Sequence, residues 1–234
     1  MNFNSQGNPN LKPSDHYNLD LKWDFNPTPT ELISLTAFYK LIKNPISRIE
    51  VASAGGYLSY ENIADKATVA GVGIEIRKNL FVRPVSNAAH GMNKLSLGLN
   101  GSYIYTNAKM PLATVTTGSQ LEGAAPWIVN FDLSHNFTKG ERSFVNTLVL
   151  NYVSDKIYTI GTQGYQDMME KGVLTLDFVS QAKLNKHLSL NLKARNLLNP
   201  SYKLSRKANE NGEKVILNDY KKGINISLGV SCTF

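Results

Sequence analysis

The chain has little of what membrane helices, disulfide frameworks and metal sites require. No stretch approaches the roughly 18 uninterrupted apolar residues of a membrane-spanning helix. The single cysteine, Cys232, excludes an internal disulfide framework. The four histidines, His16, His90, His135 and His187, lie far apart and show no paired metal-ligand spacing. We therefore predict no metal site and no cofactor.

Catalytic and nucleic-acid-binding signatures are also scarce. The sequence contains no Gly-Xaa-Ser-Xaa-Gly nucleophile elbow and no phosphate-binding loop. Its formal net charge is +7, but the basic residues are scattered between strands and loops instead of gathering in one arm. We therefore predict that the protein is not an enzyme and does not bind nucleic acid.

The most informative feature that is present is a long alternation of apolar and polar residues. Between Gly223 and the carboxy terminus every second residue is apolar: Ile224, Ile226, Leu228, Val230, Cys232 and Phe234. Because side chains alternate across a strand, this segment has one apolar and one polar face. Strands of soluble domains average about 5–6 residues, whereas a tilted membrane-crossing strand needs about 9–11. The length of the alternation favours a transmembrane strand.

The same pattern recurs along the whole chain. It predicts nine long strands, over about 17–25, 32–41, 59–78, 94–106, 126–137, 142–158, 172–184, 187–197 and 216–234. No helical period competes over comparable length, although a turn of helix fits 165–172. The fold class is therefore predicted to be all-β, an antiparallel meander whose strands have one apolar face.

The predicted connections alternate in length. Short ones at 26–31, 79–93, 138–141 and 185–186 are interleaved with long ones near 43–58, 107–125, 159–171 and 199–215. Short turns on one rim and long loops on the other are typical of bacterial outer-membrane barrels, whose short turns face the periplasm. We expect the polar face to line the lumen, where cross-strand pairing explains its charged residues better than catalysis does: Glu75, Arg77, Asp132, Asp177, Lys183, Lys193 and Arg195.

Several short motifs resemble one family in their order along the chain. They are Asn8-Pro-Asn-Leu-Lys-Pro13, Ala37-Phe-Tyr-Lys40, Tyr60-Glu-Asn-Ile-Ala-Asp-Lys-Ala67, Gly71-Val-Gly-Ile-Glu75, Leu121-Glu-Gly-Ala-Ala-Pro126 with Asn130, Ala194-Arg-Asn-Leu-Leu-Asn-Pro-Ser-Tyr202, and the terminal Phe234. Together they resemble the carboxy-terminal half of the barrel of TonB-dependent outer-membrane receptors, especially those of the Bacteroidetes type. The chain departs from the family at Gly73, where an acidic residue is common.

The resemblance implies a barrel of about 22 strands around an amino-terminal plug. Such receptors take up large solutes, such as iron-siderophore complexes, cobalamin or glycans, with energy from the inner membrane. This chain would supply about nine strands in contact with outer-membrane lipid, and the TonB system would act only through parts amino-terminal to it. The resemblance also makes Phe234 the signal that the barrel assembly machinery recognises.

Strand direction and the amino end predict that residues 1–234 form one carboxy-terminal barrel segment without the plug and the amino-terminal strands. Nine antiparallel crossings make the first and last strands run the same way, so these two cannot close an antiparallel barrel. Residues 1–10 have neither the basic stretch nor the apolar core of a secretory signal. We expect a fragment of a larger receptor.

Ligand contacts are expected from the long loops. The candidate residues are Lys109, Gln120, Glu122, Gln163, Tyr165, Lys203 and Arg206. Two alternatives stay open at this point. One is another outer-membrane barrel, such as a porin or a barrel enzyme, and the other is a soluble β-sandwich that binds a partner.

Overall fold

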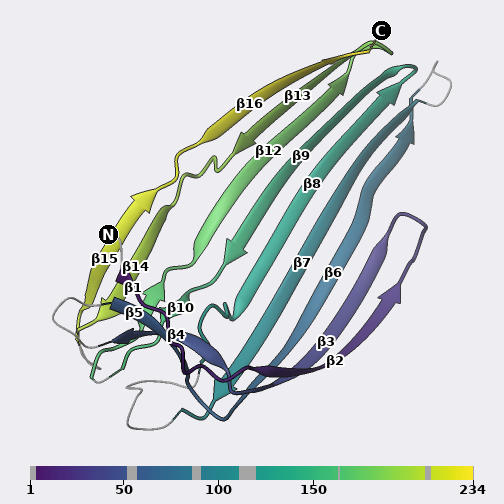
Figure 1. Ribbon diagram of the computed structural model, residues 1–234. Coiled ribbons are helices and arrows are strands. Elements are labelled where there is room, and N and C mark those ends of the chain that lie inside the picture. The colour runs from purple at the N-terminus through teal and green to yellow at the C-terminus, as the bar shows by residue number, and fades with distance from the viewer. Residues whose placement is uncertain are drawn as a thin grey trace.

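The computed structural model describes residues 4–51, 57–85, 91–110, 120–162, 164–208 and 212–233. In these ranges the chain is all-β, with sixteen strands in three sheets. None of the described residues forms a helix that could cross a membrane. Figure 1 shows one large tilted sheet with the two small sheets at one of its ends.

The large sheet is a nine-stranded antiparallel meander. Its strands, in spatial order, are β16 (Asn225–Cys232), β13 (Leu188–Arg195), β12 (Val173–Lys183), β9 (Arg142–Val153), β8 (Trp127–Lys139), β7 (Met92–Ala108), β6 (Lys66–Pro84), β3 (Leu32–Lys43) and β2 (Asp15–Phe25). Within the described residues β16 and β2 are its two edges. The predicted fold class and the nine long antiparallel strands are confirmed.

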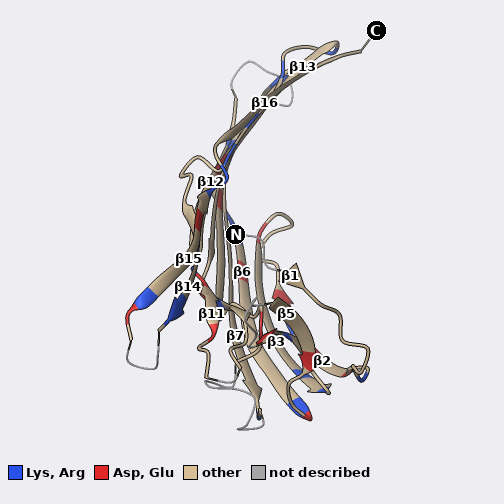
Figure 2. Cartoon of the chain, turned by 60° about the vertical axis from the view of Figure 1, so that its left-hand side comes forward, with Lys and Arg blue, Asp and Glu red and all other residues tan. Residues whose placement is uncertain are grey.

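The two small sheets lie at the end where the long connections are (Figure 1). One has the order β1 (Asn4–Ser5), β5 (Tyr57–Asn62), β4 (Ile46–Val51). The other has the order β10 (Lys156–Thr159), β11 (Met168–Glu170), β14 (Ser201–Lys207), β15 (Lys214–Lys221). In Figure 2, β13 and β16 form a single thin layer at one end of the molecule, and the body at the other end is much wider.

These small sheets correct the prediction that the long connections are loops. The segment 43–58 contains β4 and the start of β5, the segment 199–215 contains β14, and 165–172 contains the strand β11 instead of a turn of helix. Where the chain leaves the main sheet, its backbone N–H and C=O groups still need hydrogen-bond partners. The connecting segments supply these partners to one another by forming the small sheets. The described parts of the connections at 43–58, 159–171 and 199–215 therefore extend the sheet architecture.

Three predicted strands are each divided between two sheets. The segment 59–78 separates into β5 and β6, 142–158 into β9 and β10, and 216–234 into β15 and β16. The last division lies beside a kink where Asn196 and Gly223 adopt positive φ, and the Asn196 Nδ2 donates to the Gly223 carbonyl over 2.7 Å. Asparagine and glycine tolerate this left-handed backbone, so the hairpin can turn away from the main sheet.

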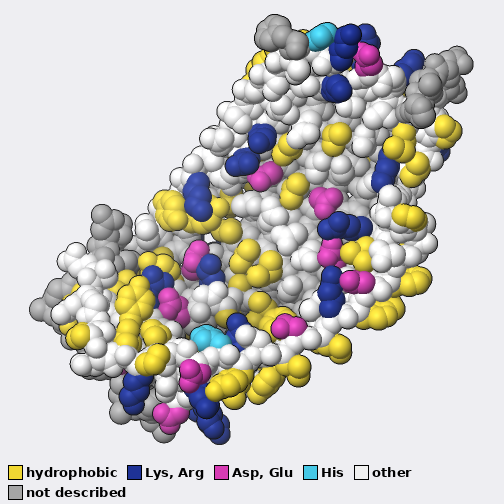
Figure 3. Space-filling model, turned by 45° about the vertical axis from the view of Figure 1, so that its right-hand side comes forward, with side chains coloured by type: hydrophobic (Ala, Val, Ile, Leu, Met, Phe, Trp, Pro, Cys, Tyr) yellow, Lys and Arg dark blue, Asp and Glu magenta, His cyan; other side chains and the backbone are white. Residues whose placement is uncertain are grey.

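Strand register gives the large sheet two different faces. On the outer face, Phe131, Leu150 and Leu176 lie opposite one another on β8, β9 and β12. On the inner face, Asn130, Asn151 and Thr175 do the same. All the charged residues predicted on the polar side fall on the inner face by this register: Glu75, Arg77, Asp132, Asp177, Lys183, Lys193 and Arg195. Figure 3 shows charged side chains spread over a hollowed surface.

Among the described residues, no second layer covers the outer apolar face. Leu21 and Leu228 are each 72% exposed, and Val72 is 57% exposed. The main cluster of buried apolar side chains instead lies where the small sheets meet the end of the large one, around Ile49, Ile157 and Ile160. A soluble β-sandwich would bury the apolar face of its main sheet, so this arrangement contradicts that alternative.

Two substitutions on β9 test the assignment of the faces. Leu150→Arg places a charge at the middle of the apolar face and is expected to destabilise the protein in a bilayer by about 2–4 kcal/mol. The neighbouring Asn151→Arg places the same charge on the polar face and is expected to cost much less. Protease-resistant folded protein in liposomes measures both effects, and equal losses would contradict the assignment.

Candidate functional site

The long-connection end is held together by a bridge between the two small sheets. Ile49 of β4 pairs in parallel with Ile160, which follows β10. The Glu50 N–H donates to the Ile160 carbonyl over 3.2 Å, and the Ile160 N–H donates to the Arg48 carbonyl over 3.1 Å. Both isoleucine side chains are buried. Segments more than a hundred residues apart in the sequence thus form one body.

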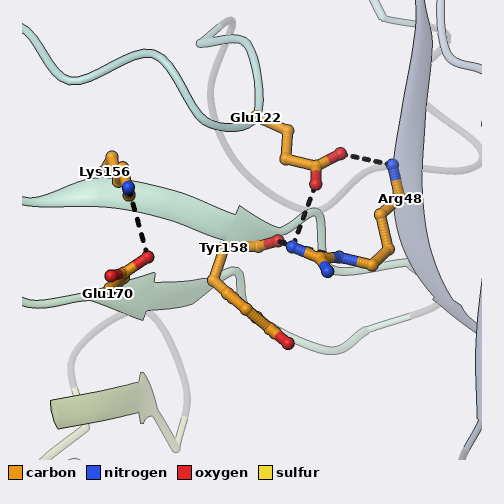
Figure 4. A network of polar contacts seen from close by, with 5 residues as sticks. All are labelled: Arg48, Glu122, Lys156, Tyr158 and Glu170. Atoms are coloured by element: carbon orange, nitrogen blue, oxygen red, sulfur yellow. Dashed lines mark hydrogen bonds and ion pairs between the residues drawn. The ribbon is translucent and has the colours of Figure 1, made fainter. Parts of the chain in front are cut away.

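Arg48 is the centre of a polar network in this body (Figure 4). Its guanidinium forms an ion pair with Glu122 at 3.0 Å, and its Nε donates to the Tyr158 carbonyl over 3.1 Å. The Arg48 backbone N–H also donates to the Glu122 carboxylate. The guanidinium lies 3.9 Å from the centroid of the Tyr158 ring. One arginine therefore joins β4, the 120–126 segment and β10.

Arg206 of β14 plays a matching part on the other side. Its guanidinium pairs with the Glu50 carboxylate, and both side chains are largely buried. The Thr162 hydroxyl donates to the Glu50 carbonyl, which ties the segment after β10 to the same strand. The Tyr165 ring lies 5.2 Å from the Arg206 guanidinium carbon. We refer to Arg48, Glu50, Glu122, Tyr158 and Arg206 as the loop cluster.

Beside the loop cluster lies an open cavity of about 150 Å³ with tyrosines in its wall. Tyr202 and Tyr220 stack with ring centroids 5.5 Å apart, and the Lys222 ammonium lies 3.9 Å from the Tyr202 centroid. We call this cavity the tyrosine pocket; its lining residues are Tyr158, Glu170, Tyr202, Lys203, Leu204, Asn218 and Tyr220. Exposed aromatic faces next to amide and carboxylate oxygens can hold a ring-shaped polar solute by stacking and hydrogen bonds.

Burial shifts the pKa of two groups in the loop cluster. Loss of water raises the pKa of Glu122 above its ordinary value of 4.5, although the Arg48 backbone N–H and the Arg48 charge act in the opposite direction. Burial likewise lowers the pKa of Arg206. In both cases desolvation disfavours the charged form. The ion pairs therefore mainly offset the free-energy cost of burying the charges and add little net stability.

The structure places the predicted ligand residues in different situations. Lys109 and Gln120 are exposed. Tyr165 is also exposed and lies beside Arg206, while Glu122 and Arg206 belong to the loop cluster. Lys203 lines the tyrosine pocket and forms an ion pair with Asp219 at 3.3 Å. Ligand binding by any of them stays a prediction.

Two predicted residues lie outside the described ranges. They are the ligand candidate Gln163 and the terminal Phe234, the predicted assembly signal.

Sequence reasoning missed the residues that organise this end of the molecule. Arg48 and Glu50 were assigned to a loop, but they alternate with the apolar Ile49 and Val51, which is the signal of a strand. Tyr202 and Tyr220 were not singled out, because only the β14–β15 register brings them opposite each other. Local spacing carries no information about such a pairing.

Comparison with known proteins supports a single family. The family model described as "TonB dependent receptor-like, beta-barrel" matches residues 1–197. That range contains every strand of the nine-stranded sheet except β16. No curated protein and no solved structure matches the chain.

Breaking the Glu50–Arg206 pair should loosen the long-connection end. Arg206→Met leaves a largely buried carboxylate without its partner, which is expected to cost about 3 kcal/mol in local opening. Lys203→Met is the matched control, because its pair with Asp219 is more exposed and worth about 0–1 kcal/mol. Hydrogen exchange of β4 and β14 amides measures the difference; equal protection in the two variants would contradict a structural role for the pair.

The raised pKa of Glu122 predicts that the stability of this end of the molecule falls as the pH rises. The folded pKa of Glu122 is raised, so the folded state holds more protons between the ordinary value of 4.5 and the raised one, and stability falls as pH rises through this window. We expect the β4 amides to lose protection over that range, after correction for intrinsic exchange rates. Glu122→Gln should remove the effect, and an unchanged pH profile in this variant would refute the assignment.

Proposed function

This chain belongs to the TonB-dependent receptor-like β-barrel family, and we propose that it forms part of the wall and the long extracellular loops of a receptor that takes up a large solute. The members of this family are transporters of the outer membrane and not enzymes. The observation that carries the proposal is the nine-stranded sheet with one exposed apolar face and one polar face, within the range that the family model matches.

The proposed orientation follows from the two ends of the sheet. Short turns join β8 to β9 and β12 to β13, and such turns face the periplasm in outer-membrane barrels. The small sheets, the loop cluster and the tyrosine pocket then lie on the extracellular side, where a solute arrives. The polar inner face lines the lumen.

We further propose that the nine strands belong to a larger closed barrel. Unpaired N–H and C=O groups at a sheet edge are too costly in hydrocarbon, so β2 and β16 require neighbouring strands there. Coupling to the TonB system would run through the amino-terminal plug that the family has, and not through these strands. The motifs of the chain favour the Bacteroidetes type, and Phe234 is proposed as the signal read by the assembly machinery.

The solute classes proposed are iron-siderophore complexes, cobalamin and glycans. All three are too large for passive diffusion through a narrow pore and carry rings or polar groups that tyrosine, amide and charged side chains can contact. The proposed contacts are the tyrosine pocket, including Lys203 in its wall, and the exposed residues Lys109, Gln120 and Tyr165. Glu122 and Arg206 would act on the solute indirectly, by holding the loops in place.

Uptake measured in cells tests the function. A strain that lacks the gene and its complemented partner are compared for uptake of a labelled ferric siderophore, cyanocobalamin and a labelled oligosaccharide, with and without a functional TonB. We expect uptake of one probe to require both the gene and TonB. Uptake that needs the gene but continues without TonB would indicate a porin and contradict the proposal.

Variants of the tyrosine pocket refine the result. Replacing Tyr202 and Tyr220 together by Ala should raise the concentration needed for half-maximal uptake at least tenfold, because stacking on both rings is lost. Tyr105→Ala is the control, since Tyr105 is as exposed as Tyr220 but lies on the outer face. The same effect in both variants would exclude the pocket as the solute site.

A further inference from the structure

A row of polar side chains crosses three neighbouring strands on the outer face of the large sheet. His135, Asn146 and Ser180 lie directly opposite one another on β8, β9 and β12. Apolar residues continue the row on both sides, with Leu95 opposite His135 and Leu192 opposite Ser180. We call the three residues the polar row.

Hydrogen bonds organise the polar row. The Ser180 hydroxyl donates to the Asn146 Oδ1 over 2.7 Å, and the His135 Nε2 lies 2.8 Å from the Asn93 Oδ1. Both contacts use the oxygen of an asparagine amide. The Nδ2 groups of Asn93 and Asn146 are then the parts of this surface that can donate to an external acceptor, because the ring of His135 already donates through its Nε2.

The position of the row relative to a bilayer follows from the aromatic residues on the same face. Phe137 and Trp127 are separated by ten residues of β8, which is roughly 33 Å along a strand. A tilt of about 40° reduces this to roughly 25 Å, the height of the apolar band of a membrane barrel. Phe137 and its neighbour Phe144, with ring centroids 6.4 Å apart, therefore mark the interface at the short-turn side. The polar row lies one layer deeper.

Basic side chains stand on the other side of the two phenylalanines. Lys139 and Arg142 lie opposite each other beyond Phe137 and Phe144, and by register they share the outer face. Arg83 lies opposite Asn93 on the same face. All three are exposed, and the acidic residue at this turn is Glu141. We call Arg83, Lys139 and Arg142 the basic rim.

We propose that the polar row and the basic rim bind one anionic glycerophospholipid of the periplasmic leaflet. The basic rim is at the depth of a lipid phosphate, which Arg and Lys attract. The polar row lies just inside the apolar band, where the ester carbonyls at the edge of the band are the nearest acceptors for its donors. The acyl chains lie over Leu133, Leu148 and Phe178, the next layer of the outer face. This inference rests on the membrane placement proposed above.

Native mass spectrometry of the protein extracted from membranes in mild detergent tests the site. The probes are phosphatidylglycerol and phosphatidylcholine at equal concentration, with lipopolysaccharide in a separate arm. We expect retained phosphatidylglycerol to exceed phosphatidylcholine at least tenfold, with lipopolysaccharide not competing. Equal retention of the two phospholipids, or displacement by lipopolysaccharide, would overturn the proposal.

Paired variants locate the binding. Replacing Lys139 and Arg142 together by Gln should reduce the preference for phosphatidylglycerol at least tenfold, because each basic residue near an anionic surface contributes about fivefold. The control replaces Lys43 and Lys66 by Gln, since this exposed pair also lies across two strands but at the opposite end of the sheet. A loss of equal size in the control would overturn the proposal.

The polar row is tested separately by replacing His135 and Asn146 together by Leu. This change suits an apolar face, so the fold should persist while retention of phosphatidylglycerol falls, and unchanged retention would overturn the role of the row. If the variants do not fold, the comparison of phosphatidylglycerol with phosphatidylcholine on the unmodified protein still tests whether the site prefers an anionic lipid. Recovery of the unmodified protein only in the soluble fraction would refute membrane placement itself, whereas membrane-bound protein without lipid preference would refute this site alone.

Discussion

The structure depends on the need of every backbone polar group for a partner where water is absent. In hydrocarbon a sheet can meet this need only when its strands are bonded on both sides, and the side chains must then alternate between lipid and lumen. The nine-stranded sheet follows this rule along its length, with rows such as Phe131, Leu150 and Leu176 outside and Asn130, Asn151 and Thr175 inside. The exposed apolar face is thus a consequence of the solvent it meets, and the buried core of the molecule is confined to one end.

At that end the constraint changes, because the backbone is surrounded by water and by other loops. There, partly buried ion pairs join the segments to one another: Arg48 with Glu122, and Arg206 with Glu50. Desolvation weakens the charged state of Glu122 and of Arg206, so these pairs position β4, β10 and β14 more than they stabilise them. The tyrosine pocket depends on this positioning, since Tyr158 comes from β10 while Tyr202 and Tyr220 come from β14 and β15. The proposed lipid contacts at one end and the proposed solute contacts at the other are then separated along the strands.

Much of the large sheet could be predicted from the sequence, because period-two alternation is a local signal that persists over ten or more residues. The same signal placed Glu75, Arg77 and Asp132 on the inner face without knowledge of the register. The small sheets were missed because strands such as β11, of three residues, are too short to show a period. The Arg206–Glu50 pair and the Tyr202–Tyr220 stack were beyond reach for a different reason: they depend on how distant segments meet, which a single sequence does not encode locally. His135, Asn146 and Ser180 each interrupt an apolar alternation, but only the strand register shows that they form one row.

The central claim is that consecutive residues of one strand face lipid and water in turn. Single cysteines at 148, 149, 150, 151 and 152 of β9, in a variant with Cys232 replaced by Ser, can be spin-labelled in liposomes. Collision rates with oxygen, which concentrates in hydrocarbon, and with a water-soluble nickel complex are then measured at each position. The account predicts high oxygen and low nickel accessibility at 148, 150 and 152, and the reverse at 149 and 151. The same accessibility at all five positions would contradict it.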